Sequence, residues 1–369
     1  MSPGVYVHIP FCRSKCPYCG FYSVPSKRPV PIWFEGIKKE IRLYKGLFGR
    51  FDSLYLGGGT PTFLDDAILS CLTDHLFAHF DFTADREFTI EANPCDLSAE
   101  KIRLLKDLGI NRVNVGIQSF DDGALAFLGR RHTGREAENS LKRLRRLGFR
   151  NIGVDLIYGL PGQTLEHWEG TLNQALLFQP EHISCYELTL EEQTVFGRLQ
   201  EKGEMHGLSE EDGRAFFLAA AKRLGEAGYV HYEVSNYART EAFCCRHNSK
   251  YWNRSPYLGL GPSAHSFDGT ERWWNVRSVR HYGALLKRGS PPIQARETLT
   301  KEQIRLESLA LGFRTSQGVA LTRMALEPRS TEMLSTLKTA GLLKLKDGRV
   351  VPTEEGFLVA DSLPLCFFP

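Results

Sequence analysis

The sequence lacks any long hydrophobic run, although 42% of its 369 residues are hydrophobic. No apolar stretch reaches the roughly 18 to 20 residues that cross a bilayer, so a helical membrane span is not expected. An excess of one charge is also missing, because 46 basic and 43 acidic residues leave a net charge of +3. This balance indicates neither a nucleic-acid-binding chain nor a disordered one. The length suits a barrel domain with a smaller appendage.

The first residues, Met-Ser-Pro-Gly, lack the charged and apolar segments of an export signal. We therefore expect the chain to stay in the reducing cytoplasm, where its nine cysteines remain thiols. Four of the cysteines stand alone in the sequence and are predicted to be small buried side chains. They are Cys71, Cys95, Cys185 and Cys366.

Three other cysteines, Cys12, Cys16 and Cys19, follow the apolar run YVHIPF at CxxxCxxC spacing, with no fourth cysteine directly after them. Three thiolates can each bind one iron of a 4Fe-4S cubane and leave the fourth iron open to another ligand. Half of a zinc site is the alternative, with Cys244 and Cys245 as a distant second half. A disulfide framework is a further alternative, and the spacing favours the iron–sulfur cluster over both.

Apolar, β-branched runs alternate with helical patterns up to about residue 190. This order predicts an α/β fold with a parallel sheet and right-handed crossovers, and six repeats indicate a partial (β/α)6 TIM-like barrel. The predicted strands are 5–9, 53–56, 87–91, 112–117, 152–158 and 182–187. The predicted helices are 31–48, 65–80, 98–108, 134–147 and 165–178, and Ser98 is the expected N-cap of the third.

Successive predicted strands end in groups that can face a ligand, as at the catalytic face of a barrel. The second strand leads into GGGTPT, where missing side chains let the backbone approach a ligand. The third ends at Glu91, a carboxylate that can accept hydrogen bonds from ribose hydroxyls. Gln118 and Asp155 belong to the fourth and fifth strands, and Arg130 between them can clamp a carboxylate. Each group alone also fits a turn, a cap or a solvated side chain, and their shared position predicts a site.

The segment 229–282 is rich in tyrosine and tryptophan and contains the letters RHNSKYW. Its aromatic rings can sandwich a porphyrin, and His247 can bind haem iron through an imidazole nitrogen. Arg246, Arg254 and Arg272 can pair with propionates. Judged by the residues alone, an ordinary aromatic core with one hydrogen-bonded histidine fits better.

The last part of the chain is predicted to be mainly helical and to end in a hairpin around Asp347-Gly348. Helices followed by a hairpin resemble a winged helix, but no basic patch supports a DNA-binding regulator, and a cap on the barrel explains the segment as well. The predicted helices here are 209–226, 301–313, 321–326 and 330–340. The predicted domains are 1–200, the barrel; 201–295, its aromatic-rich extension; and 296–369, a helical, winged-helix-like domain.

The motifs YVHIPFCRSKCPYC, GGGTPT, EANP, GIQSF, LGRRH and DLIYGLPGQT resemble the HemN-type branch of the radical S-adenosylmethionine (SAM) superfamily through nearly the whole chain. The resemblance implies a partial barrel with a 4Fe-4S cluster on Cys12, Cys16 and Cys19 and with SAM on the open iron. The residues implied to line this SAM are Tyr6, Tyr18, Gly58 and Glu91. Those at positions similar to the lining of a second SAM are Gly59, Thr60, Gln118, Arg130 and Asp155.

Departures from the branch distinguish its members. Coproporphyrinogen oxidases carry a further cysteine where this chain has Phe21, and a longer segment before the cluster than the eleven residues that precede Cys12. HNxxYW matches the motif of the HemW-type haem chaperones. This resemblance implies a haem donor and a membrane-associated haemoprotein acceptor as partners, with no nucleic acid. The alternative is an oxygen-independent coproporphyrinogen III oxidase. The residues implied to bind haem are His247, Asn248, Tyr251 and Trp252.

Overall fold

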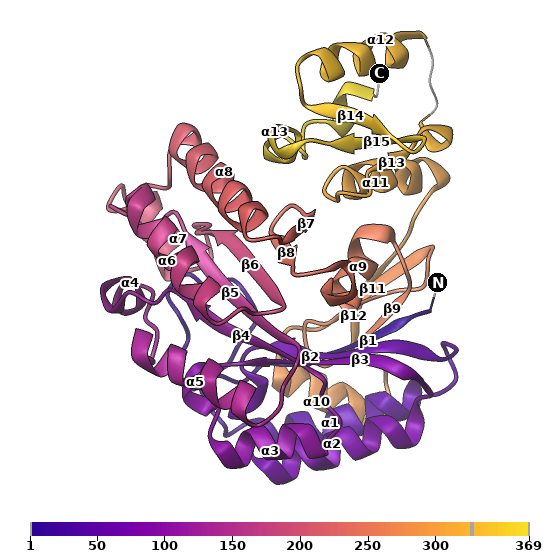
Figure 1. The fold of residues 1–369 in the computed structure, drawn as a ribbon. Helices are drawn as coiled ribbons and strands as arrows, with labels where there is room; N and C mark the ends of the chain where they lie inside the picture. Colours follow the sequence, from indigo (N-terminus) through magenta and orange to yellow (C-terminus); the bar gives the residue numbers. More distant parts are fainter. Residues whose placement is uncertain (1, 325–327, 368–369) are drawn as a thin grey trace.

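A computed structural model describes residues 2–324 and 328–367. Within this part of the chain, a twelve-stranded sheet curves around an interior, helices cover its outer face, and a smaller domain stands at one end (Figure 1). The strand order is β12-β11-β10-β9-β1-β2-β3-β4-β5-β6-β8-β7. The sheet is open rather than closed, since β12 and β7 are its two edges.

The six predicted strands form the centre of the sheet and are parallel, which confirms the partial barrel. In β1, Val5, Val7 and Ile9 are fully buried against the helices, while the alternate residues Tyr6 and His8 face the interior. The bounds are β1 Gly4–Ile9, β2 Phe51–Gly58, β3 Phe82–Ala92, β4 Arg112–Gln118, β5 Ile152–Tyr158 and β6 His182–Glu187.

The predicted helices of the barrel are present, within a few residues of the expected limits. Three of them begin at hydroxyl side chains, Ser98, Thr133 and Thr164, which accept a hydrogen bond from a backbone N–H of the first turn, so the Ser98 cap is confirmed. The bounds are α1 Val30–Leu43, α2 Asp66–His79, α3 Ala99–Asp107, α4 Asp122–Phe127, α5 Gly134–Arg146, α6 Leu165–Leu177, α7 Val195–Glu201 and α8 Glu210–Glu226.

Six further strands of this sheet were not predicted from the sequence. Most span only three to five residues, too few for a periodic pattern to stand out. Two extend the sheet beyond β6, and four extend it beyond β1, with β9 parallel to β1 and the rest antiparallel. The bounds are β7 Val230–Glu233, β8 Asn236–Ala238, β9 Tyr257–Leu260, β10 His265–Phe267, β11 Glu271–Asn275 and β12 Ile293–Thr298, and the helices among them are α9 Arg246–Asn253 and α10 Val279–Lys287.

The C-terminal domain has its own apolar core around Leu309, Phe313 and Val350, separate from the barrel core. Its helices and three-stranded sheet follow a winged-helix-like order, and Asp347 and Gly348 turn the predicted hairpin with positive φ angles of 49° and 70°. The helix predicted over 321–326 is a short 3-10 turn, Leu321–Arg323, as far as the described residues extend. The bounds are α11 Lys301–Gly312, β13 Val319–Ala320, α12 Pro328–Thr339, β14 Leu343–Lys346, β15 Arg349–Pro352 and α13 Glu354–Leu358. The domain limits given above stay a prediction.

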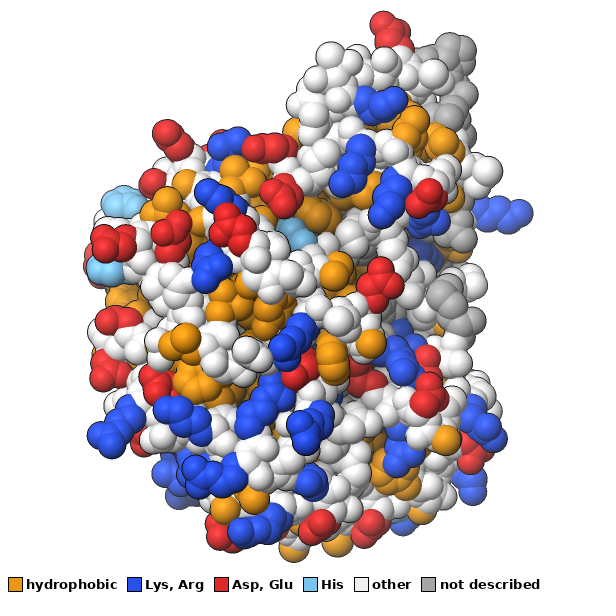
Figure 2. Space-filling model, in the orientation of Figure 1, with side chains coloured by type: hydrophobic (Ala, Val, Ile, Leu, Met, Phe, Trp, Pro, Cys, Tyr) orange, Lys and Arg blue, Asp and Glu red, His pale blue; other side chains and the backbone are white. Residues whose placement is uncertain are grey.

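The nine cysteines are all free thiols. Cys185 is buried as predicted, but Cys71 and Cys95 are exposed and Cys366 is half-buried, because these three lie on helical turns at the surface. None of the described helices combines the length and the hydropathy of a membrane span. On the face that Figure 2 shows, acidic and basic side chains are interspersed over the C-terminal domain.

Candidate functional site

The cysteine loop leaves β1 at the carboxyl end of the barrel, which we call the mouth, and backbone hydrogen bonds fix its base. Cys12 N–H donates to the Val24 carbonyl at 3.2 Å, and Val24 N–H donates to the Pro10 carbonyl at 2.6 Å. The His8 ring contacts the Tyr22 carbonyl through Nε2 at 2.9 Å. Both ends of the loop are therefore held against β1, which positions the cysteines between them.

The glycines after β2 dock this strand against the same loop. Gly59 N–H donates to Ile9 O and Thr60 N–H donates to Phe11 O, both at 2.9 Å. A Cβ at Gly59 would lie only 2.9 Å from backbone atoms of Ile9 and Phe11, and Gly58 has a φ of +110°. The sequence predicted glycine here for close approach to a ligand, and the structure shows that the approaching group at Gly59 is the protein's own backbone.

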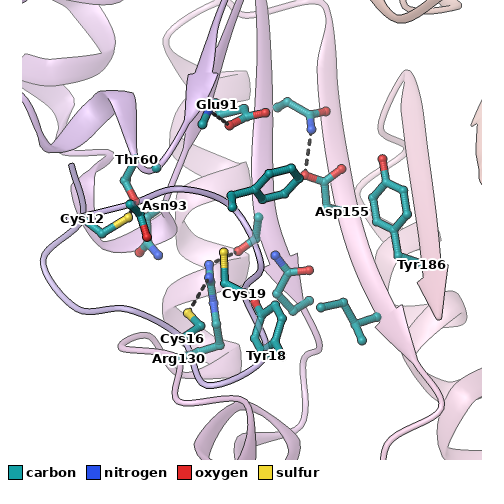
Figure 3. A pocket seen from close by; sticks show the side chains of 18 of the residues that line it. Cys12, Cys16, Tyr18, Cys19, Thr60, Glu91, Asn93, Arg130, Asp155 and Tyr186 are labelled. Atoms are coloured by element: carbon teal, nitrogen blue, oxygen red, sulfur yellow. Dashed lines mark hydrogen bonds between the residues drawn. The ribbon is translucent and has the colours of Figure 1, made fainter. Parts of the chain in front are cut away.

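Two hydrogen-bond donors point at cysteine sulfurs. Thr60 Oγ1 donates to Cys12 Sγ at 3.4 Å, and Arg130 Nη1 donates to Cys16 Sγ at 3.6 Å (Figure 3). Burial raises the pKa of the Cys12 and Cys19 thiols, so a bound metal is needed to keep them as thiolates at neutral pH. Hydrogen bonds to sulfur are a usual way in which a protein tunes an iron–sulfur cluster.

The three cysteines suit a cubane better than a single metal ion. In the described residues, no three His, Cys, Asp or Glu side chains are grouped closely enough for one ion. In a cubane each cysteine binds a separate iron, so the sulfurs remain apart around a shared space. Cys12, Cys16 and Cys19 line one cavity in this manner. Cys245 lines the other end of that cavity, which argues against a joint zinc site.

The cavity behind the cysteine loop has a volume of about 490 Å³ and extends into the barrel (Figure 3). Side chains from the ends of β2 to β6 line it, as expected for a ligand at the mouth of a barrel. It includes every residue predicted to bind SAM except Tyr6. These are Tyr18, Gly58, Gly59, Thr60, Glu91, Gln118, Arg130 and Asp155.

Glu91 lies at the centre of the cavity wall. Tyr55 donates its hydroxyl to Oε1 at 2.9 Å, and the Gly58 N–H donates to Oε2 at 3.0 Å. Burial raises the pKa of Glu91 to about 7, and Asp155 adds to this, although the hydrogen bond from Tyr55 opposes it. Each oxygen keeps a further lone pair, so the ionised carboxylate can accept hydrogen bonds from a diol such as a ribose.

Arg130, Gln118 and Asp155 line the same cavity, with Arg130 beside Cys16. Arg130 Nη2 donates to the Gly116 carbonyl at 2.6 Å, which aims the guanidinium at the loop. Gln118 ends β4 with a φ of 70°, a left-handed conformation that is uncommon outside glycine. Asn114 donates to Asp155 Oδ2 at 2.7 Å, and burial raises the pKa of Asp155.

Several lining residues were not singled out from the sequence, although they lie in or directly after predicted strands. Asn93 follows Glu91 in the EANP letters, Asn114 lies within β4, and Ser184 and Tyr186 lie on β6. A polar residue at every second position of a buried strand was the available signal, since alternate side chains of these strands face the interior.

Tyr6 is not among the residues that line the cavity, so its predicted contact with SAM stays a prediction. Its hydroxyl contacts His8 Nδ1 at 3.0 Å, and its ring centroid lies 6.1 Å from that of Tyr55 and 6.3 Å from that of His247. Tyr6 faces the interior as expected for its position in β1 and packs among the rings of His8, Tyr55 and His247.

The HNxxYW letters form helix α9, which closes the amino end of the barrel, here called the floor. The N–H groups of Arg246 and His247 both donate to the Glu87 carboxylate at 2.9 Å, an anion at the helix N-terminus. Lys250 pairs with Asp52 at 2.6 Å. These contacts attach α9 to β2 and β3, at the end of the barrel opposite the cysteine loop.

His247 is a buried structural residue in this arrangement, with an exposed fraction of 1%. Its Nδ1 contacts Ser53 Oγ at 3.0 Å and its Nε2 contacts the Tyr251 hydroxyl at 3.1 Å. Burial lowers the pKa of His247 to about 3, so the ring is neutral. Both nitrogens are occupied, so the structure does not favour His247 as a haem ligand. Asn248 is the motif residue that reaches the cavity.

The arginines expected to bind propionates are paired with carboxylates instead. Arg246 contacts Asp85 at 3.3 Å, and Arg254 and Arg272 both contact Glu307 of α11. Trp252 is half-buried, and the guanidinium of Arg314, in the C-terminal domain, lies 5.8 Å from the centre of its ring. The surroundings of α9 therefore connect the floor to the C-terminal domain.

Comparison with known proteins agrees with this architecture. The radical SAM superfamily matches residues 6–175, and the HemN C-terminal domain matches residues 299–359. The structure of coproporphyrinogen III oxidase (HemN) from Escherichia coli, described as a radical SAM enzyme, superposes with a TM-score of 0.83 at 22% identity, covering 99% of this chain and 90% of that chain. Fold and cysteine loop thus define a protein of the radical SAM class.

Similarity to characterised sequences narrows the class. Heme chaperone HemW of Bacillus subtilis is 36% identical over 370 residues, which cover 97% of each chain. That of Lactococcus lactis is 33% identical over 97% of this chain and 95% of its own. That of Escherichia coli is 36% identical over 71% of this chain and 69% of its own. The chain belongs to the HemW family of the radical SAM superfamily.

Proposed function

We propose that this protein is a haem chaperone that carries a 4Fe-4S cluster and SAM, binds haem and transfers it to acceptor haemoproteins. The observation that carries the proposal is the similarity to heme chaperone HemW over 97% of both chains. It extends through the cysteine loop, the barrel and the small C-terminal domain.

In this proposal Cys12, Cys16 and Cys19 would hold the cluster, which would supply one-electron reduction chemistry to SAM bound in the adjoining cavity. Thr60 and Arg130 donate hydrogen bonds to two of the ligand sulfurs and keep the loop ordered. The cavity-lining residues hold SAM, with Glu91 accepting hydrogen bonds from its ribose. These roles are supported by the shared cavity and by the donors that already point at sulfur.

The partners that follow from a chaperone role are haem itself, a haem donor and a membrane-associated haemoprotein acceptor. Nine free cysteines and a solvent-accessible cluster loop suit a reducing compartment, so we place the protein in the cytoplasm.

Phe21 argues against the alternative, a coproporphyrinogen III oxidase. Its side chain is 69% exposed at the rim of the cavity, at the position where the oxidases of the branch carry a further cysteine. An exposed aromatic ring at this point offers an apolar contact for a flat ligand and no sulfur chemistry.

The test is an anaerobic titration of the reconstituted protein with hemin, followed by transfer to an apo-haemoprotein. We expect one haem per chain, released on mixing with the acceptor. A parallel incubation with SAM, dithionite and coproporphyrinogen III measures decarboxylation. Protoporphyrinogen formation without haem binding would establish the oxidase instead.

A further inference from the structure

A row of residues crosses the strands beyond β1 on the face that continues the barrel interior. Strand pairing places Tyr6 beside Gly259, His265 beside Trp274, and Trp274 beside Ala295. Because β9 is parallel to β1 and β10 returns antiparallel, β10 begins at the mouth, where His265 is its first residue. The row therefore lies at the height of Tyr6, below the cysteine loop and on the mouth side of Phe267.

The side chains of this row leave His265 accessible. His265 is exposed, and its ring stacks on Trp274 with the centroids 5.8 Å apart and the planes at 22°. The row neighbours of these two rings, Gly259 and Ala295, are small, so no large side chain of the row covers the rings. Neither nitrogen of His265 is hydrogen-bonded to another residue in the described part of the chain. This is the reverse of His247, whose nitrogens are both occupied.

His265 is also in the protonation state that a metal requires. Neighbouring protein partly shields the ring from water and, with the charge of Arg272, lowers the pKa of His265. A neutral imidazole keeps a lone pair for iron at physiological pH.

An unpaired cation stands near this surface. Arg277 follows β11 at the mouth, is exposed, and makes no ion pair with any described residue; its guanidinium lies 6.0 Å from the Tyr22 ring. Tyr22 belongs to the base of the cysteine loop, where its carbonyl contacts the His8 ring at 2.9 Å, so Arg277 stands at the base of this loop. An arginine in this position suits a carboxylate such as a propionate.

Helix α9 supports the row from below through a chain of aromatic contacts. The rings of His247 and Tyr251 meet edge to face at 5.5 Å, Tyr251 meets Tyr257 at 4.8 Å, and Tyr257 lies 6.2 Å from Phe267. Phe267 shares with His265 both its strand and its face of the sheet. The HNxxYW motif thus holds the strand that carries His265, and its loss would disturb that strand without removing an iron ligand.

We propose that the haem cargo binds on this row, with His265 as an axial ligand of the iron, Trp274 against the porphyrin edge and Arg277 at a propionate. The proposal rests on the proposed haem-chaperone function and assigns its binding site. Haem would then lie beside the SAM cavity, with the motif histidine acting as a positioning residue.

The test is a hemin titration of wild-type protein and three variants, followed by Soret absorption and by electron paramagnetic resonance of the ferric iron. His265→Ala is expected to lose the histidine-ligated spectrum and to bind hemin at least roughly tenfold more weakly, because loss of an iron ligand costs more than loss of its support. Added imidazole should restore the spectrum. His281→Ala, an exposed histidine on the outer helix α10, should bind as wild type.

His247→Ala separates the motif from the ligand. It should keep the histidine-ligated spectrum at saturating hemin while its melting temperature falls. If His265→Ala kept both the spectrum and the affinity, or if His247→Ala alone lost the spectrum while folded, the assignment of His265 would be overturned. Failure of the wild type to bind hemin would instead contradict the haem-chaperone function.

Discussion

At the floor of the barrel polar side chains satisfy one another, whereas at the mouth the same kinds of side chain keep open bonding positions. Glu87 accepts two backbone N–H groups of α9, and His247 is bonded through both nitrogens. At the mouth, the cysteine thiols face a cavity and His265 has no hydrogen-bond partner among the described residues. The two histidines, His247 and His265, thus differ in role because their surroundings differ.

This difference shows which end of the barrel has side chains that can still bind a ligand. A buried polar group is costly to leave unpaired, and a group whose hydrogen-bonding positions are all taken within the protein has none left for a ligand. Residues of the floor are therefore expected to affect folding when replaced, and residues of the mouth to affect cofactors. The following predictions test this division.

The largest effect is expected at the cysteines of the mouth. Cys16→Ala removes one of three protein ligands of the cluster, so the iron and sulfide content after anaerobic reconstitution should fall to background. Cys71→Ala, on the outer face of α2, should load fully. A loaded Cys16→Ala protein would contradict the cluster site.

The next effect belongs to the floor. Glu87→Ala leaves two buried N–H groups of α9 without an acceptor, which should lower the free energy of unfolding by roughly 2–4 kcal/mol. Chemical denaturation measures the loss, and iron content should stay at the wild-type level. Asp85→Asn, whose side chain is largely exposed beside Arg246, is the matched control and should change little. If Glu87→Ala lost its iron while it remained folded, the floor would not be purely structural.

Arg130→Met tests whether a mouth residue other than the cysteines affects the cofactors. It removes a charged donor to Cys16 Sγ and an arginine from the cavity wall, so SAM binding should weaken by roughly 10- to 100-fold, the value of a charge-assisted hydrogen bond. Equilibrium binding and a redox titration of the cluster are the measurements, and the reduction potential should fall, because a donor to sulfur stabilises the reduced state. Arg135→Met, exposed on α5, should match wild type in both.

The smallest effect concerns the pH dependence of the cofactor-free protein. The folded-state pKa of Glu91 is raised to about 7, so the fold favours its protonated form. Its contribution to stability is full below the ordinary carboxyl pKa and is lost as the pH rises through about 7. The pH dependence therefore falls between about pH 4.5 and 7, where the melting temperature of wild type should decrease more with pH than that of Glu91→Gln. Glu40 and Glu233, whose pKa values burial also raises to about 7, contribute a slope of the same sign in both proteins, and buried histidines with lowered pKa values, such as His8, contribute one of opposite sign. Identical slopes would show that Glu91 is not desolvated.

The sequence by itself determined the barrel, the cysteine loop and most of the cavity. Strands β1 to β6 are recognisable because each is a continuous apolar run between helical patterns, and parallel strands place their carboxyl ends together. Glu91, Gln118, Arg130 and Asp155 could therefore be expected around one cavity from local order alone. Cys12, Cys16 and Cys19 needed only their spacing.

Only the tertiary structure decided what lies on each side of that cavity. Short strands such as β9 to β11 carry too few residues for a pattern, and the pairing of β9 with β1, on which β10 and β11 follow, is a contact across about 250 positions of the chain. That pairing brings His265 to the mouth, while the contacts of α9 with Glu87 and Ser53 bury His247 at the floor. The letters of a motif do not state which of two histidines keeps a free nitrogen, because that depends on neighbours contributed by distant strands.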